Sequence, residues 1–333
     1  MAAPAQPIES PFRRRARGLG RVVGPIREAR GFPKVMLYIG AAITLFFVLL
    51  ALLAPVIAPY DFDQYQSGGK RFAQLEGPSS DHLFGTTVQS TDVLSRVIWG
   101  AQTELKVVII SLVFAITLGV PLGLLSGYFG GKLDRGLVLV MDSLYAFPYL
   151  LLAIVIAFLL SNSLGKGVLT AAIAISATYV PLYFRVVRNQ VIALREESYV
   201  EAARALGAKP FTIIRKYVFH NVVQNVPPIA TLNAADAILL LTALGFLGYG
   251  IQPTDAAEWG YDSSRAVSDA ASGIWWTALF PGIAIVLLVT GLTLVGEGLN
   301  ETMNPVLRRR RFEKVSFADE VGAPAALEAA GSE

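Results

Sequence analysis

The 333-residue sequence has no cysteine and only two histidines, His82 and His220. The absence of cysteine excludes disulfide bonds, thiolate zinc sites, iron–sulfur clusters and a cysteine nucleophile. Two distant histidines without an HExxH motif give little basis for a metal site. Charged residues are also scarce, at 16% of the chain, against about 25% in a soluble domain. A net charge of +3 in so apolar a sequence argues against a nucleic-acid partner.

Long apolar runs account for much of the chain, which is 54% hydrophobic. A bilayer core about 30 Å thick needs about 20 apolar residues in a helix. Five charge-free runs approach or exceed that length, and a sixth is interrupted only by Asp236. We therefore predict an all-α membrane protein with six transmembrane helices. The six runs are 35–60, 107–131, 143–165, 167–184, 217–254 and 270–296.

The distribution of lysine and arginine predicts the orientation, because cytoplasmic loops carry an excess of these residues. With the N-terminus inside, 22 of the 28 basic residues fall on the cytoplasmic side and 6 outside. Both termini are therefore expected to be cytoplasmic. The first run is too long for the apolar region of a signal peptide, so we predict a retained helix. The predicted organisation is a basic tail (1–34), a first helix (35–60), an extracytoplasmic loop (61–105), a five-helix core (106–307) and a C-terminal tail (308–333).

The most structured polar sequence, residues 198–210, lies between the fourth and fifth predicted helices. Ser198 and Glu201 have the spacing of a capping box at a helix start. Gly207 suits the left-handed conformation that ends a helix, and Pro210 suits the first turn of the next one. We therefore predict a short helix, a tight bend and a second helix beneath the membrane. The first helix contains the small residues Ala202, Ala203 and Ala205, which would allow another protein to approach closely. This favours a docking element over a purely structural cap.

This segment resembles the EAA loop of the integral-membrane subunits of bacterial ABC transporters. Glu201-Ala202-Ala203 is followed after three residues by Gly207, although Phe219-His220 replaces the Leu-Pro that closes the family pattern. Other segments are similar to the C-subunit type of the dipeptide, oligopeptide and nickel permeases. They are His82–Thr86 with Asp92–Arg96, Leu244–Pro253 with Glu258–Gly260, and Gly296–Asn300 with Asn304-Pro305.

The resemblance implies the type I ABC importer permease fold, in a multi-pass protein of the bacterial inner membrane. It also implies a homologous permease subunit, two ATPase subunits and an extracytoplasmic solute-binding protein as partners. ATP and Mg would bind to those ATPase subunits and no cofactor to this chain, whose sequence has no GxxxxGK[ST] motif. The ATPase would be contacted by the loop 188–220, through Ser198, Glu201, Ala202, Ala203, Leu206, Gly207, Lys209 and Pro210.

Asp236 is the acid within the fifth predicted helix. A carboxylate there costs about 2.5–3.5 kcal/mol, so contact with lipid is disfavoured. One interpretation places Asp236 and Asn233, one turn earlier, on the translocation pathway, where they would favour a cationic or amine-bearing solute. The other is a hydrogen bond to a neighbouring helix or to the partner subunit.

Three glycines, Gly119, Gly123 and Gly127, repeat every four residues in the second predicted helix, a spacing that allows close helix packing. Peptides are the solute expected first, with nickel or another small solute as alternatives. A stand-alone secondary transporter is disfavoured because the sequence has no convincing internal repeat. An intramembrane hydrolase is disfavoured because His82 lies outside the predicted spans and His220 lies at the inner boundary of one.

Overall fold

The protein is described by a computed structural model in which residues 32–303 are placed, and these residues are mostly helical. Contacts divide the chain into two units. The unit Arg30–Asn300 contains nearly all the described residues and is the one considered below. Most of the predicted basic tail and the whole of the predicted tail 308–333 lie outside the described residues.

Five helices in the described range are long and apolar enough to cross a membrane, and a bent helix pair gives a sixth candidate. This confirms the predicted class, a helical protein with several membrane spans. One of the five candidates is a nearly continuous helical segment, Pro210–Phe246, made of α9 (Pro210–Ile213), a π-helical turn (Ile214–Val218), α10 (Phe219–Val222), a 3-10 turn (Val223–Asn225) and α11 (Val226–Phe246). The other four are α3 (Phe32–Ile57), α4 (Val93–Phe129), α7 (Val168–Leu194) and α13 (Trp276–Met303).

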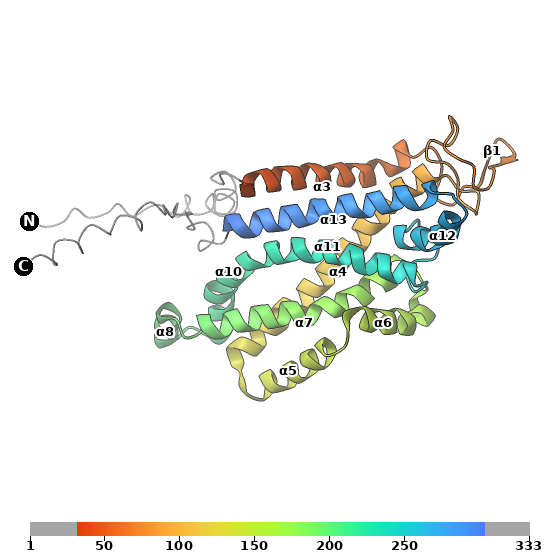
Figure 1. Ribbon diagram of the computed structural model, residues 1–333. Coiled ribbons are helices and arrows are strands. Elements are labelled where there is room, and N and C mark those ends of the chain that lie inside the picture. Colours follow the sequence, from red (N-terminus) through yellow and green to blue (C-terminus); the bar gives the residue numbers. More distant parts are fainter. Residues whose placement is uncertain (1–31, 304–333) are drawn as a thin grey trace, which may run out of the picture. The chain divides into compact units, whose positions relative to one another are not determined.

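The sixth candidate overlaps the helix predicted over 143–165. It consists of α5 (Gly131–Tyr145) and α6 (Tyr149–Leu164), whose axes meet at 97° (Figure 1). Pro148 stands directly before α6, and a residue that precedes proline is disfavoured in helical conformation. Pro148 therefore divides the predicted apolar run between the end of α5 and the whole of α6.

The second and fourth predicted helices are longer than their apolar runs. The helix α4 starts at Val93, so residues 93–105 of the predicted outer loop are helical. Its start is capped by Asp92, whose Oδ2 accepts a hydrogen bond from the Ser95 N–H at 2.7 Å. The helix α7 extends to Leu194, into the segment predicted as the loop 188–220.

The helices α4 and α7 pack closely because three glycines of α4 face α7. A β-carbon added to Gly119, Gly123 or Gly127 would lie 2.7–2.8 Å from α7 atoms, closer than real side chains approach. The neighbouring α7 residues are Tyr183, Phe184, Val187, Arg188 and Val191. The predicted close packing at this four-residue spacing is thus confirmed.

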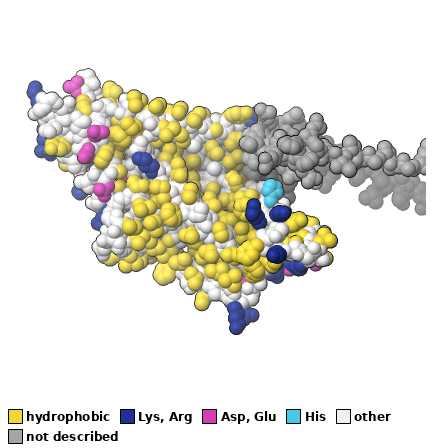
Figure 2. All heavy atoms as spheres, turned by 180° about the vertical axis from the view of Figure 1, so that it is seen from behind, with side chains coloured by type: hydrophobic (Ala, Val, Ile, Leu, Met, Phe, Trp, Pro, Cys, Tyr) yellow, Lys and Arg dark blue, Asp and Glu magenta, His cyan; other side chains and the backbone are white. Residues whose placement is uncertain are grey.

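Polar segments gather at the two ends of this unit. The loop end carries the segment 58–92, with a two-stranded antiparallel hairpin (β1, Gln66–Ser67; β2, Lys70–Arg71), and the helix α12 (Trp259–Ala271) (Figure 1). The opposite end carries α8 (Ser198–Ala205) and is called the α8 end below. Figure 2 shows hydrophobic side chains across the face between these ends, with most charged side chains at the ends. This arrangement fits a protein that spans an apolar layer.

Candidate functional site

The predicted elbow between two short helices is present at the α8 end. Gly207, the residue after the C-cap of α8, has a φ of +79°, in the left-handed region. Its N–H donates to the carbonyl of Arg204, and the Ala208 N–H donates to that of Ala203, both at 3.0 Å. These two bonds form a Schellman motif, the usual end of a helix at glycine. Pro210 then occupies the first turn of α9, as predicted.

The predicted capping box at Ser198 is wrong. Glu197 is the N-cap of α8, and no side chain caps the helix there. The carbonyl of Glu197 accepts hydrogen bonds from the N–H groups of Val200 and Glu201, at 2.9 and 3.1 Å. Ser198 therefore already lies inside the first turn, where its side chain no longer holds the N-cap position.

The elbow has a buried face and an exposed face. Val200 and Ala203 are buried in an apolar cluster with Ile213, Ile214 and Val218, which anchors α8 to the π-helical turn. Leu206, one of the predicted contact residues, is 89% exposed, because the helix ends before it and Leu206 does not join the buried face. The other predicted contact residues, Ser198, Glu201, Ala202, Gly207, Lys209 and Pro210, are also exposed.

Ion pairs connect the helix that leads into the elbow to its neighbours. Arg188 of α7 forms a bidentate ion pair with Asp134 of α5, with nitrogen–oxygen distances of 2.6 and 2.8 Å. Arg195, which ends α7, donates to the carbonyl of Gly127 of α4 at 3.2 Å. The end of α7, which leads directly into the elbow, is therefore held to both α4 and α5.

The structure gives Asn233 and Asp236 different surroundings. Asn233 is 5% exposed, and its amide nitrogen has no hydrogen-bond partner among the described residues. Asp236 is exposed, and its carboxylate lies close enough to Tyr179 of α7 to interact with it electrostatically. Only Asp236 is therefore open to a solute or to a second subunit.

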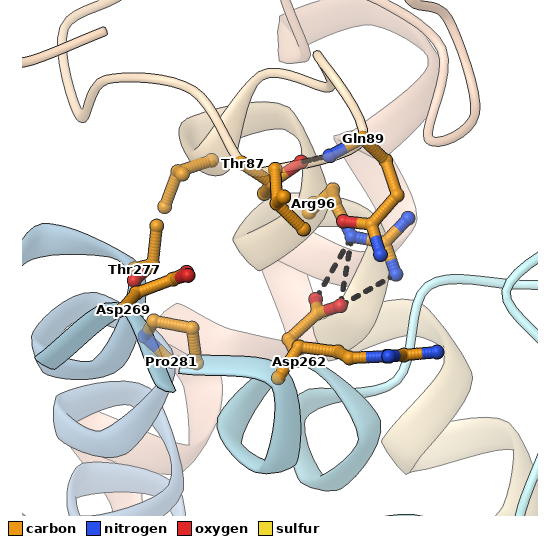
Figure 3. Close-up of a pocket in the computed structure, with 10 residues that line it drawn as sticks. Thr87, Gln89, Arg96, Asp262, Asp269, Thr277 and Pro281 are labelled. Carbon is orange, nitrogen blue, oxygen red and sulfur yellow. Dashed lines mark hydrogen bonds and ion pairs between the residues drawn. The ribbon is translucent and has the colours of Figure 1, made fainter. Parts of the chain in front are cut away.

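At the loop end, an ion pair joins α4 to α12. Arg96 contacts both carboxylate oxygens of Asp262, with a shortest distance of 2.7 Å, and also donates to the carbonyl of Phe62 at 2.9 Å. Figure 3 shows this pair in the wall of a pocket that is also lined by Thr277 and Asp269. Arg96 thus fixes α12 and the loop to the start of α4.

The segment Glu258-Trp259-Gly260, singled out by its resemblance to permeases, forms the start of α12, with Glu258 as the N-cap. The Glu258 carboxylate caps this helix, accepting from the N–H groups of Gly260 and Tyr261 at 2.6 and 2.7 Å. Burial raises the pKa of Glu258 from its ordinary value. The Trp259 ring donates to the Val97 carbonyl at 3.1 Å. The motif therefore holds α12 against α4.

Sequence reasoning missed Glu104, which lies in α4 and is completely buried beside Glu258. It also gave no role to Arg96 or Asp262. All three were counted as members of polar segments outside the membrane. The sequence did contain a signal for a helix that starts at Val93. Asp92 and Ser95 have the spacing at which a side-chain oxygen accepts a hydrogen bond from a backbone N–H of the first helical turn.

Comparison with known proteins establishes the family. Residues 119–309 match the family model described as "binding-protein-dependent transport system inner membrane component", and residues 36–78 match the N-terminal transmembrane domain of oligopeptide transport permease C. The first match covers more than half of the chain. The chain belongs to this family of transport permeases, and within it to the group related to the C-type oligopeptide permeases.

Individual relatives agree with this assignment. The dipeptide transport system permease protein DppC of Alkalihalophilus pseudofirmus is 37% identical over 291 residues, covering 86% of this chain and 91% of the relative. The glutathione transport system permease protein GsiD of Pectobacterium atrosepticum is 32% identical, covering 81% and 88%. DppC of Bacillus subtilis is 33% identical, covering 81% and 82%.

A solved chain of the MetNI methionine ABC transporter, in inward-facing conformations, shares the fold. The TM-score is 0.51 at 21% sequence identity, and the match covers 62% of this chain and 94% of the other. This likeness supports the predicted ABC importer permease fold. The protein is therefore a membrane-spanning permease subunit of a binding-protein-dependent transport system, a family that works with other permease, ATPase and binding-protein subunits.

Proposed function

We propose that this subunit forms part of the translocation pathway for peptides and couples it to separate ATPase subunits through the elbow of α8 and α9. The main support for the coupling role is that the elbow has one buried face and one exposed face. Val200 and Ala203 anchor it in the apolar cluster, while Leu206 projects at 89% exposure. A protruding leucine on a short helix held by packing suits insertion into a cleft of another protein.

The coupling contact is tested with Leu206→Glu in the complete transporter. The expected result is normal membrane insertion, with loss of peptide-stimulated ATP hydrolysis and of uptake, because a charge replaces the exposed apolar contact. Leu83→Glu is the matched control, since Leu83 is 61% exposed at the opposite end and should retain both activities. Unchanged coupling in Leu206→Glu would contradict the proposal.

Peptide is the proposed solute class because the relatives are named dipeptide and glutathione transport permeases. In the proposed complex, a homologous permease subunit completes the pathway, two ATPase subunits bind and hydrolyse ATP with Mg, and an extracytoplasmic binding protein delivers the solute. The proposed location is the bacterial inner membrane, with the α8 end in the cytoplasm, as the basic residues predict.

Asp236 is the proposed site of charge selection in this pathway. This proposal is supported by the exposure of Asp236 on a membrane helix, beside Tyr179, since an exposed carboxylate is accessible to an amine-bearing solute. Asp236→Asn should reduce uptake of peptides with a free N-terminal amine more than uptake of N-acetylated ones. An equal reduction for both would favour a packing role against the partner subunit instead.

A further inference from the structure

Two glutamates are buried together at the loop end of the membrane helices. Glu104 of α4 and Glu258, which precedes α12, each have no exposed surface. Their carboxyl groups are close enough to interact directly. Two charged carboxylates in one buried place repel each other and lose their hydration, which is costly unless one of them is neutral.

The hydrogen bonds show which carboxyl group holds the negative charge. Each oxygen of Glu258 accepts from a backbone N–H, those of Gly260 and Tyr261. Neither oxygen of Glu104 accepts a hydrogen bond of good geometry from residues 32–303, and the backbone of Trp259 is the one backbone donor among them that acts on it. A neutral Glu104 can instead donate its own proton, and the nearest acceptor for it is Glu258.

The surrounding helices supply no positive charge to the pair. Asp262 is the further charged group that acts on Glu258, and its own charge is paired with Arg96. On the other side, Glu258 rests on Gly245 of α11, where a β-carbon would collide with its carboxylate. The remaining charged side chains on the packed elements are Lys106 of α4, Asp236 of α11, and Arg265 and Asp269 of α12.

We propose that Glu104 and Glu258 form a proton-binding site, in which one proton on Glu104 is shared with the Glu258 carboxylate and joins α4 to the corner between α11 and α12. Loss of this proton to water leaves two buried negative charges and loosens the corner. Because the loop end is predicted to lie outside, the site would respond to external pH.

The sign of the pH effect follows from the burial of the pair. Burial raises the pKa of Glu258, so the folded protein holds a proton that the unfolded chain releases near its ordinary value. Stability is therefore greatest at low pH and declines as the pH rises through the raised pKa. In Glu104→Gln, the amide can donate to Glu258 at every pH and the second carboxylate is gone, so this decline should be smaller.

The test uses the assembled transporter in lipid nanodiscs, from about pH 5 to about pH 9. We expect the wild-type melting temperature to fall with rising pH and the Glu104→Gln value to fall clearly less over the same range. The exposed-acid control Glu76→Gln should follow the wild type. Infrared spectra should show a neutral carboxylic acid C=O band in the wild type that is absent from Glu104→Gln and disappears as the pH rises.

A melting profile of Glu104→Gln that parallels the wild type, or an infrared difference spectrum without that band, would overturn the proposal. If Glu104→Gln does not assemble, Glu104→Asp keeps the acid while moving it, and the C=O band must shift. An unshifted band would show that the neutral acid lies elsewhere, which also overturns the assignment.

Discussion

Arg96 of α4 and Asp262 of α12, separated by 166 residues in the sequence, form a buried ion pair with a shortest nitrogen–oxygen distance of 2.7 Å. Their side chains are 6% and 10% exposed. The pair fixes the amphipathic helix α12 to the start of a membrane helix. A buried pair contributes little net stability, but removing one member leaves the other charge unpaired.

We therefore expect Arg96→Ala and Asp262→Ala each to destabilise the protein, by about 3–5 kcal/mol, with a double variant less affected than the sum of the two. Thermal unfolding of the purified complex measures this. The comparison pair is Arg185–Asp142, with side chains 43% and 55% exposed, where substitution should change stability by about 0–1 kcal/mol. Additive losses at Arg96 and Asp262 would contradict a coupled pair.

The glycine contact between α4 and α7 gives a second prediction. Gly123→Leu should prevent normal packing, because even its β-carbon would lie 2.7 Å from the carbonyl of Phe184. Gly136→Leu, in α5, is the control, since nothing lies within 4 Å of the added β-carbon. Yield of monodisperse protein after extraction measures the difference, and equal yields would argue against close packing at Gly123.

The end of α8 gives a third prediction. Gly207→Ala should destabilise the elbow by about 1–2 kcal/mol, because an alanine is strained at a φ of +79°. Gly207→Asn should be milder, since asparagine tolerates this conformation. Coupling of ATP hydrolysis to uptake in the complete transporter should follow the same order, wild type, then Asn, then Ala. An alanine variant that matches the wild type would show that the bend is not limiting.

The orientation can be tested by thiol labelling, because the natural chain has no cysteine. Thr254→Cys and Lys209→Cys both introduce an exposed thiol, one near α12 and one in the elbow. In intact cells, an impermeant reagent should label the first and reach the second only after the membrane is opened. The reverse pattern would invert the proposed topology and the proposed contact with the ATPase.

The sequence predicted the membrane helices well over the stretches that contain no charged residues. It placed the start of α4 too late because Arg96 and Glu104 were read as marks of an aqueous loop. In the fold, Arg96 is neutralised by Asp262 and Glu104 is buried beside Glu258. Such partners are distant in sequence, so the pattern of charges along one segment cannot reveal them.

The elbow was more predictable because its shape depends on local conformation. Gly207 and Pro210 each restrict the backbone in a way that does not require distant contacts. The exposure of Leu206 follows from the same local conformation, because the Schellman motif turns the chain away from the buried face there. Which exposed residues bind a partner is not encoded in local conformation, and the coupling role stays a proposal.

The close contact of α4 with α7 limits how this subunit can move. Close contacts at Gly119, Gly123 and Gly127 extend over about 12 Å of the helix, so sliding or separating the two helices would break many contacts at once. We therefore expect α4 and α7 to move together as one rigid unit when a route for the solute opens. Relative movement is then confined to looser boundaries, including those with neighbouring subunits.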